Sequence, residues 1–292
     1  MNKKIFSFFM ILILGISIPF NCINMIAHAN PGISYTEAGT EYDLSNAIHI
    51  SSVKDLKNIS EKCISDTWSR NKVFVLEANL DLSDSEFTSI PTFGGIFLGQ
   101  GHTISGLSFS GGSNNTGLFR YVQESGEIYH LSISGTASAE GTHQGLSLLV
   151  GCNYGLISGC NTSGNITGED QVGSIAGVNE ISGVIMSCMS SGVVYGRHLV
   201  GGIAGENKGS ILNSSNHCFV NTTASDGNVD LTNLELNDTV TTILTTENAS
   251  SVTDVGGIAG CNSGIIRACT NSGSIGHPHV GYNVGGIAGS QV

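Results

Sequence analysis

Val172-Gly-Ser-Ile-Ala-Gly-Val-Asn179 is one copy of a short glycine-rich unit that recurs along the C-terminal half of the chain. Close copies begin at Val200, Val255 and Val284, and a more distant copy begins at Leu146. When the copies are aligned, their shared glycines are 26, 28, 55 and 29 residues apart, so one step is double. Self-similarity at a fixed period of this length is typical of solenoids, in which each unit forms one turn.

Two further apolar stretches follow each unit, and each begins after a glycine. Gly155 to Cys160 and Gly183 to Cys188 show the first stretch, and Gly164 to Thr167 and Gly192 to Tyr195 show the second. Three short strands per turn can bury one face only by stacking on the next turn. Recurrent interior glycine, at roughly 1 kcal/mol per site, argues against helical repeats. A propeller blade needs about 40 residues, so the period argues against a propeller as well. The predicted fold is all-β: a right-handed parallel β-helix (solenoid) with a short N-terminal capping helix.

Stacked turns should place residues of one repeat position in columns. The isoleucines expected to line one inner row are Ile175, Ile203, Ile258 and Ile287, and the alanines that follow them are expected to point the other way along the strand. The asparagines expected to stack at a turn, where the amide can bond the next turn and the backbone tolerates a left-handed conformation, are Asn153, Asn179, Asn207 and Asn262. We predict a structural role for these asparagines rather than a role in ligand binding.

Seven of the eight cysteines lie after the first 29 residues. Cys160, Cys188 and Cys269 occupy one repeat position, and Cys152 and Cys261 share another. Neighbouring turns are about 4.8 Å apart, which is within reach of a disulfide, but directly stacked side chains rarely reach the required torsion. We therefore expect a structural column of buried thiols, with a Cys160 to Cys188 disulfide as the alternative.

The N-terminus has the pattern of an export signal. Lys3 and Lys4 precede an apolar run from Ile5 to about Phe20, and Ala27-His28-Ala29 suits a signal peptidase. Residues 1–29 are therefore predicted to be a removed signal peptide, with an uncleaved membrane anchor as the alternative. Removal would change the formal charge from −12 to −14. Such an acidic chain is a poor partner for nucleic acid, and we expect it to be secreted or at the cell surface, with no integral membrane segment.

Residues 30–71 are predicted to be a linker and a capping helix. Ser52-Val-Lys-Asp55 resembles a capping box, and Leu56, Ile59 and Cys63 follow at helical spacing. Residues 72–82 are predicted to form the first strand of a β-helix that covers residues 72–292.

Two parts of the predicted β-helix are irregular. Residues 216–253 account for the double step, and their asparagine and threonine content favours a polar loop inserted into one turn. A degenerate turn with Val229, Leu231, Leu234 and Leu236 pointing inward is the alternative. The last unit ends without a visible cap. This predicts either a truncated product or an edge that pairs with another chain by self-association through this C-terminal turn.

The repeat units resemble the GLUG motif, a glycine-rich repeat of bacterial extracellular proteins. The stretch from Phe93 to Leu107 resembles the opening turn of such proteins, although Leu98 stands where that turn usually has an aspartate. The resemblance covers about residues 72–292. It implies a parallel β-helix, and it says little about activity, because the family includes surface proteins, adhesin-like proteins and the non-catalytic parts of large exported proteases.

The sequence offers little for catalysis or metal binding. Glu169-Asp170 is the only adjacent acidic pair in the repeats and is expected in a solvated turn, and no Asp-Asp pair, Gly-His-Gly element or H-E-x-x-H motif is present. No C-x-x-C or H-x-x-x-H spacing occurs, and His277-Pro-His279 is predicted to lie in an exposed loop. We therefore predict no metal or other cofactor.

We therefore predict a non-catalytic extracellular module for adhesion, binding or structural display, whose ligand-binding residues the sequence does not identify. The expected partners are glycans, or host, matrix or cell-envelope proteins. One alternative is a polysaccharide-degrading β-helix enzyme, either a lyase or a glycoside hydrolase. The other is the non-catalytic N-terminal part of a larger exported protein such as a protease.

Overall fold

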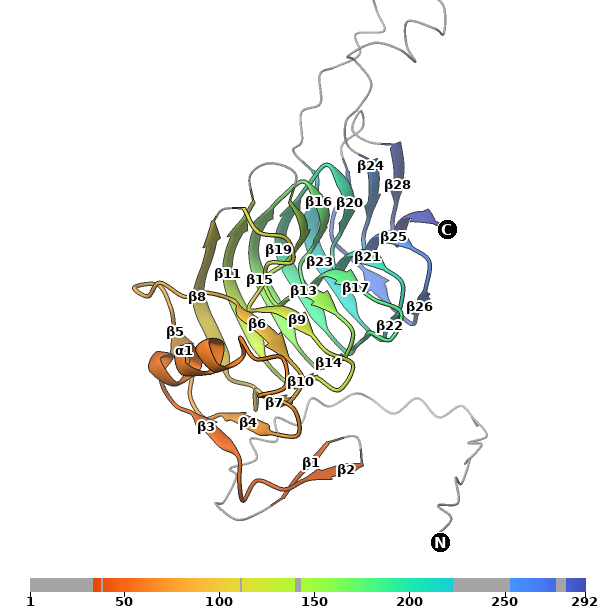
Figure 1. Ribbon diagram of the computed structural model, residues 1–292. Coiled ribbons are helices and arrows are strands. Elements are labelled where there is room, and N and C mark those ends of the chain that lie inside the picture. The colour runs from red at the N-terminus through yellow and green to blue at the C-terminus, as the bar shows by residue number, and fades with distance from the viewer. Residues whose placement is uncertain (1–33, 38, 111, 140–142, 223–252, 277–281) are drawn as a thin grey trace, which may run out of the picture.

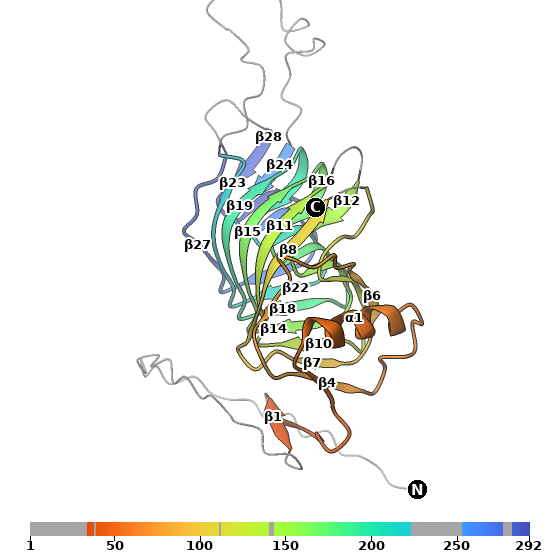
Figure 2. The same ribbon diagram turned by 90° about the vertical axis from the view of Figure 1, so that its left-hand side faces the viewer.

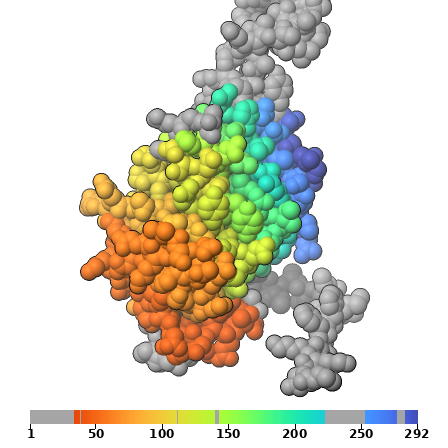
Figure 3. All heavy atoms as spheres, in the orientation of Figure 1, coloured from red at the N-terminus to blue at the C-terminus, as the bar shows by residue number. Residues whose placement is uncertain are grey.

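Four parallel β-sheets run along one axis and form the walls of a β-helix, which confirms the predicted fold class (Figure 1). The computed structural model describes residues 34–37, 39–110, 112–139, 143–222, 253–276 and 282–292. The predicted signal peptide and His277-Pro-His279 lie outside the described residues. Space-filling spheres show the turns following one another from the orange N-terminal end to the blue C-terminal end (Figure 3).

We number the sheets in the order in which one turn of the chain visits them. Sheet 1 contains β3 (Ile48–Ile50), β4 (Val73–Leu76), β7 (Ile96–Leu98), β10 (Glu127–Tyr129), β14 (Leu156–Ser158), β18 (Val184–Met186), β22 (Ser210–Leu212) and β26 (Ile265–Arg267). Sheet 2 contains β5 (Leu80–Asp81), β8 (Thr103–Ser110), β11 (Ser132–Ser138), β15 (Asn161–Thr167), β19 (Met189–Tyr195), β23 (Ser215–Val220) and β27 (Thr270–Asn271).

Sheet 3 is the shortest sheet. It contains β12 (Gln144–Leu146), β16 (Asp170–Gly173), β20 (His198–Gly201), β24 (Thr253–Gly256) and β28 (Tyr282–Gly285). Sheet 4 contains β6 (Ile90–Phe93), β9 (Phe119–Val122), β13 (Val150–Asn153), β17 (Ala176–Asn179), β21 (Ala204–Asn207), β25 (Ala259–Asn262) and β29 (Ala288–Gln291).

A complete turn has four strands, not the three that the sequence predicted. The unit Val172 to Asn179 contains a bend at Ser174-Ile175 and is split between β16 in sheet 3 and β17 in sheet 4. The bend also breaks the strict alternation of side chains. As a result Ile175 and Ala176 are both fully buried, and the alanine column belongs to the core instead of pointing away from it.

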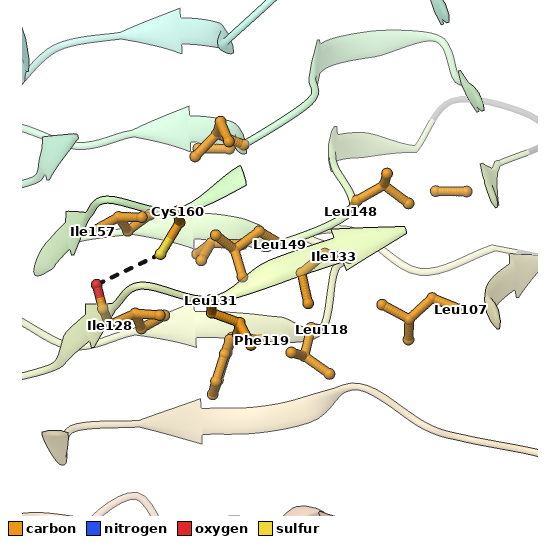
Figure 4. Close-up of a cluster of buried hydrophobic side chains, with 14 of the residues drawn as sticks. Leu107, Leu118, Phe119, Ile128, Leu131, Ile133, Leu148, Leu149, Ile157 and Cys160 are labelled. Carbon is orange, nitrogen blue, oxygen red and sulfur yellow. Dashed lines mark hydrogen bonds between the residues drawn. The ribbon is translucent and has the colours of Figure 1, made fainter. Parts of the chain in front are cut away.

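The core changes character along the axis. Phe74, Phe93, Phe97 and Phe119 pack at tilted or edge-on angles in the first turns, with ring centroids 5.0 to 6.2 Å apart. Later turns stack aliphatic side chains, such as Ile128 on Ile157, at one register position (Figure 4). Burying each such side chain contributes about 1.5 to 3 kcal/mol.

Helix α1 (Val53–Lys62) packs against the N-terminal end of the stack, as predicted for the cap (Figure 1). Ser52 Oγ accepts a hydrogen bond from the backbone N–H of Asp55, and the Asp55 carboxylate accepts one from the N–H of Ser51. Leu56 and Ile59 enter the core. Among the described residues there is no helix with the length and apolar character needed to cross a bilayer.

Sheet 1 begins earlier than residue 72, because β3 pairs in parallel with β4. The predicted single strand at 72–82 is divided into β4 and β5, which lie in different sheets. An additional antiparallel hairpin, β1 (Tyr35–Glu37) and β2 (Thr40–Tyr42), packs on the outer face of sheet 1, where Tyr42 OH donates to Glu127 Oε2 at 2.6 Å. Nothing in the repeat pattern marks this hairpin.

The double step of 55 residues joins neighbouring turns. β20 pairs directly with β24, and β21 pairs directly with β25, so no degenerate turn lies between them. The start of the predicted loop at residue 216 is wrong, because β23 continues the sheet as far as Val220, which is fully buried. Residues 223–252, with Val229, Leu231, Leu234 and Leu236, lie outside the described residues.

Left-handed backbone recurs at two corners of the turn. Between sheets 1 and 2 the residues with positive φ are Gln100, Gly101, His130, Gly159, Ser187, Asn213 and Ala268. In sheet 3 they are Gly145, Gln171, Leu199, Asp254 and Asn283. The asparagines of the repeat unit are not among them, so the left-handed conformation expected for those asparagines is found at other positions.

Candidate functional site

The four repeat asparagines form one column at the C-terminal ends of sheet-4 strands. Asn153 Nδ2 donates to Asn179 Oδ1 at 2.8 Å, and Asn179 Nδ2 donates to Asn207 Oδ1 at 2.8 Å. Asn207 Nδ2 donates to Asn262 Oδ1 at 2.6 Å. All four side chains are buried, so a ligand does not reach them.

The repeat cysteines also line the interior. Cys160 and Cys188 are buried free thiols in adjacent turns, and Cys269 is a partly buried free thiol. Cys160 Sγ donates to Ile128 O at 3.7 Å (Figure 4). Burial raises the pKa of Cys160 well above its ordinary value, so this side chain stays neutral and unreactive.

In the acidic pair Glu169-Asp170 one carboxylate forms an ion pair, and the other has a buried oxygen that lacks a hydrogen-bond partner among the described residues. Glu169 Oε2 lies 3.1 Å from Arg197 Nη1, and Asp170 is the first residue of β16 instead of part of a solvated turn. The two side chains therefore lie in different surroundings. Within the described part of the chain, no group of three His, Cys, Asp or Glu side chains is placed to hold a metal ion.

The outer face of sheet 2 is the broadest strand surface in the described structure. Strands β8, β11, β15, β19 and β23 have six to eight residues, whereas the other described strands have at most four. They lie side by side and present this face in one direction (Figure 2). Longer strands expose more outward side chains per turn, so each turn contributes three or four outward residues to this surface.

No outward side chain of these five strands is an acid, a lysine or an arginine. The first three strands expose hydroxyl and amide groups from Thr103, Ser105, Ser108, Ser110, Ser132, Ser134, Thr136, Ser138, Asn161, Ser163, Asn165 and Thr167. The last two strands expose Met189, Ser191, Val193, Tyr195, Ser215, His217 and Phe219. We call this surface the hydroxyl face.

One end of the hydroxyl face is apolar and aromatic. Phe219 is 52% exposed and Met189 is 43% exposed, which is unusual for such large apolar side chains. Val193 is the direct cross-strand neighbour of Phe219, and Tyr195 lies two residues beyond Val193 on the same face. The face therefore combines an array of hydrogen-bonding groups with an apolar platform.

The sequence analysis did not identify the hydroxyl face. Its signal is the alternation of hydroxyl and apolar residues in Ser108-Phe-Ser110, Thr136-Ala-Ser138 and Asn165-Ile-Thr167. An alignment of the units on their glycines reveals the buried columns instead. Column residues are the same from turn to turn because they touch each other, whereas the outward residues vary.

Comparisons with known proteins bear on the fold. No family model matches the chain. A stretch of 122 residues, 41% of this chain, is 30% identical to Halomucin of Haloquadratum walsbyi (strain DSM 16790 / HBSQ001) and covers 1% of that protein. The crystal structure of a proposed immunoglobulin A1 protease from Bacteroides ovatus matches with a TM-score of 0.50 and 18% sequence identity, over 85% of this chain and 62% of that chain. The chain thus spans less than two thirds of either protein, and the structural likeness shows that it shares a β-helix fold with the Bacteroides ovatus protein.

Proposed function

We propose that this protein is an extracellular, non-catalytic β-helix module that binds uncharged glycans on its hydroxyl face. The observation that carries the proposal is the composition of that face: hydroxyl and amide groups without formal charge, next to the exposed side chain of Phe219 and the half-buried side chain of Tyr195. The signal-peptide pattern at residues 1–29 supports export. The likeness of the repeats to the GLUG motif supports the same location.

Sugar rings match this surface chemically. Their hydroxyl groups both donate and accept hydrogen bonds, as serine, threonine and asparagine side chains do. Their C–H faces are apolar and can pack on an aromatic ring, which offers a large contact area with little conformational entropy to lose. A face without formal charge does not attract polyanions through long-range electrostatics.

The geometry favours binding over degradation. A glycosidase needs two carboxyl groups on opposite sides of the scissile bond, and the hydroxyl face carries no carboxylate on β8, β11, β15, β19 or β23. The other alternative, a non-catalytic part of a larger exported protein, is compatible with the same binding role. In that case the face would hold a glycan for a domain elsewhere in the longer protein.

Isothermal titration of residues 30–292 against hexasaccharides of glucose, mannose and N-acetylglucosamine tests the proposal, with heparin and polygalacturonate as charged controls. We expect binding to at least one neutral hexasaccharide and about tenfold weaker binding in Phe219→Ala, since loss of one aromatic contact costs about 1 to 1.5 kcal/mol. Tyr154→Ala is the matched control, because Tyr154 is 37% exposed and lies outside the face. The proposal fails if no neutral glycan binds, if Phe219→Ala binds like the parent, or if products of glycan cleavage appear.

A further inference from the structure

A cleft lies at the N-terminal end of the hydroxyl face, at the corner between sheets 2 and 4. The cleft results from the order of the strands in the sheets. Sheet 3 begins only at β12, so the first two turns replace its strand with the segments 82–89 and 112–118. These segments do not close the corner, and a cleft of about 810 Å³ remains between them and the end of helix α1.

The cleft is continuous with the hydroxyl face. Ser108 and Ser110, the last outward residues of β8, belong both to the face and to the cleft wall. From Ser110 an outward column continues through Ser138 and Thr167 to Tyr195.

A second column starts at Ser108 and ends at the aromatic platform. It continues through Thr136, Asn165 and Val193 to Phe219. Four strand spacings separate its ends, or about 19 Å. A hexasaccharide is long enough to reach from the platform into the cleft.

Arg120 supplies an unused donor in the cleft wall. Its Nη2 donates to Asn114 O at 3.0 Å, while its Nε is buried and has no acceptor among the described residues. Because Nε itself is enclosed, an acceptor oxygen of a ligand in the cleft would be bound by the guanidinium N–H groups that Asn114 does not use. Phe87 and Phe109 add apolar surface to the same wall.

The charges around the cleft restrict the ligand. Glu61, Asp84 and Glu86 are exposed carboxylates in its lining, against the single positive charge of Arg120. A sulfated or uronic sugar would meet net negative charge and be disfavoured. An acetamido group suits the wall better, because its carbonyl accepts from Arg120 and its methyl group packs on apolar surface.

We propose that this cleft binds the terminal N-acetylated amino sugar of a glycan whose following units lie along the hydroxyl face. This inference rests on the proposed function and adds to it a sugar class and a direction for the bound chain. The end of the chain occupies the cleft, with Arg120 as its donor, and the sugars that follow extend along the two columns toward Tyr195 and Phe219.

The test uses the disaccharide and the hexasaccharide of N-acetylglucosamine, with the glucose disaccharide as a control, titrated into residues 30–292. Ser113→Trp fills the cleft from an exposed position whose side chain makes no hydrogen bond in the described structure. We expect this variant to lose disaccharide binding and to bind the hexasaccharide about tenfold more weakly. Arg120→Gln should weaken the disaccharide similarly, with Arg120→Lys as the conservative variant. Tyr154→Ala, outside both the hydroxyl face and the cleft, should leave disaccharide affinity unchanged.

The outcomes separate the two proposals. If the hexasaccharide binds and responds to Phe219→Ala but not to Ser113→Trp, the cleft is not a subsite and the face alone binds glycan. If the glucose disaccharide binds as well as the acetylated one, the assigned sugar class is wrong. If no neutral glycan binds to the parent protein, the proposed function fails, and with it the subsite.

Discussion

Asn153 Nδ2 donates to Asn179 Oδ1 at 2.8 Å across 26 residues of sequence, and both side chains are fully buried. Each amide in the middle of this column gives a hydrogen bond to the next turn and accepts one from the turn before. The column therefore links successive turns inside the core, and it fixes the register in which they stack.

We predict that Asn179→Leu destabilises the protein by about 2 to 4 kcal/mol. The change removes the acceptor of Asn153 and the donor to Asn207, and a buried polar group left without its partner costs about 1 to 3 kcal/mol. Urea unfolding monitored by circular dichroism measures the loss. Asn165→Ala is the control, because that exposed amide should change stability by less than about 0.5 kcal/mol. Equal effects of the two changes would contradict the structural role of the column.

The repeat pattern predicted the fold because solenoid stacking repeats the same contact in every turn. Ile203 and Asn207 recur because each is hydrogen-bonded to its counterpart in the next turn, so the repeat is visible in a single sequence. The number of sheets was wrong because the bend at Ser174-Ile175 leaves no gap in the apolar run. The β1–β2 hairpin was missed because it occurs once and belongs to no repeat.

The candidate site was less predictable than the core for a related reason. Outward residues such as Thr136, Asn165 and Val193 share one column but differ in chemistry, so alignment of the units hides them. The corner cleft depends on the absence of a sheet-3 strand in the first turns, and that absence follows from the three-dimensional course of the chain. Neither feature follows from motif spacing alone.

Stability should fall at alkaline pH through the buried thiols. Burial raises the pKa of Cys218 to about 11, whereas cysteine in an unfolded chain ionises near about 8.5. Between these values the unfolded chain loses a proton that the native protein keeps. The free energy of unfolding is therefore undiminished below about pH 8.5 and decreases as the pH rises toward about 11.

We expect Cys218→Ala to reduce this loss by about 2 kcal/mol between about pH 8 and about pH 10. Urea unfolding of the parent and the variant across that range provides the measurement. The variant is less stable at neutral pH because it loses buried volume, so the comparison is between the two slopes. Parallel slopes would show that this thiol does not titrate as its burial requires.

The left-handed corner between sheets 1 and 2 offers a substitution that should stabilise the protein. Ala268 has φ of 53° and an exposed side chain. A non-glycine side chain destabilises this conformation by about 1 to 2 kcal/mol. Replacing it with glycine removes that strain, but it also lowers stability by about 0.5 to 1 kcal/mol, because glycine has greater entropy in the unfolded chain. We predict that Ala268→Gly raises the free energy of unfolding by about 0.5 to 1 kcal/mol.

The controls for this corner use the same unfolding measurement. Ala268→Val should lower stability by about 1 kcal/mol, because a branched side chain fits the left-handed region poorly. Ser138→Gly, in the extended strand β11, should lower stability by about 0.5 to 1 kcal/mol. If both glycine variants were destabilised equally, the corner would not be strained.

The last described turn leaves apolar core positions uncovered, and we predict that a polypeptide of residues 30–292 associates with a second copy of itself through this turn. Val284 and Ile287 are 44% and 41% exposed, whereas Val255 and Ile258, at the same positions one turn earlier, are fully buried. Strand edges and apolar side chains exposed together favour pairing with another chain.

Sedimentation velocity of residues 30–292 should therefore show concentration-dependent dimers. Val284→Ser with Ile287→Ser should shift the equilibrium toward monomer, while Ile181→Ser, at a position 82% exposed and outside this turn, should not. A monomer at every concentration, or an equal shift with Ile181→Ser, would show that the uncovered turn does not direct association.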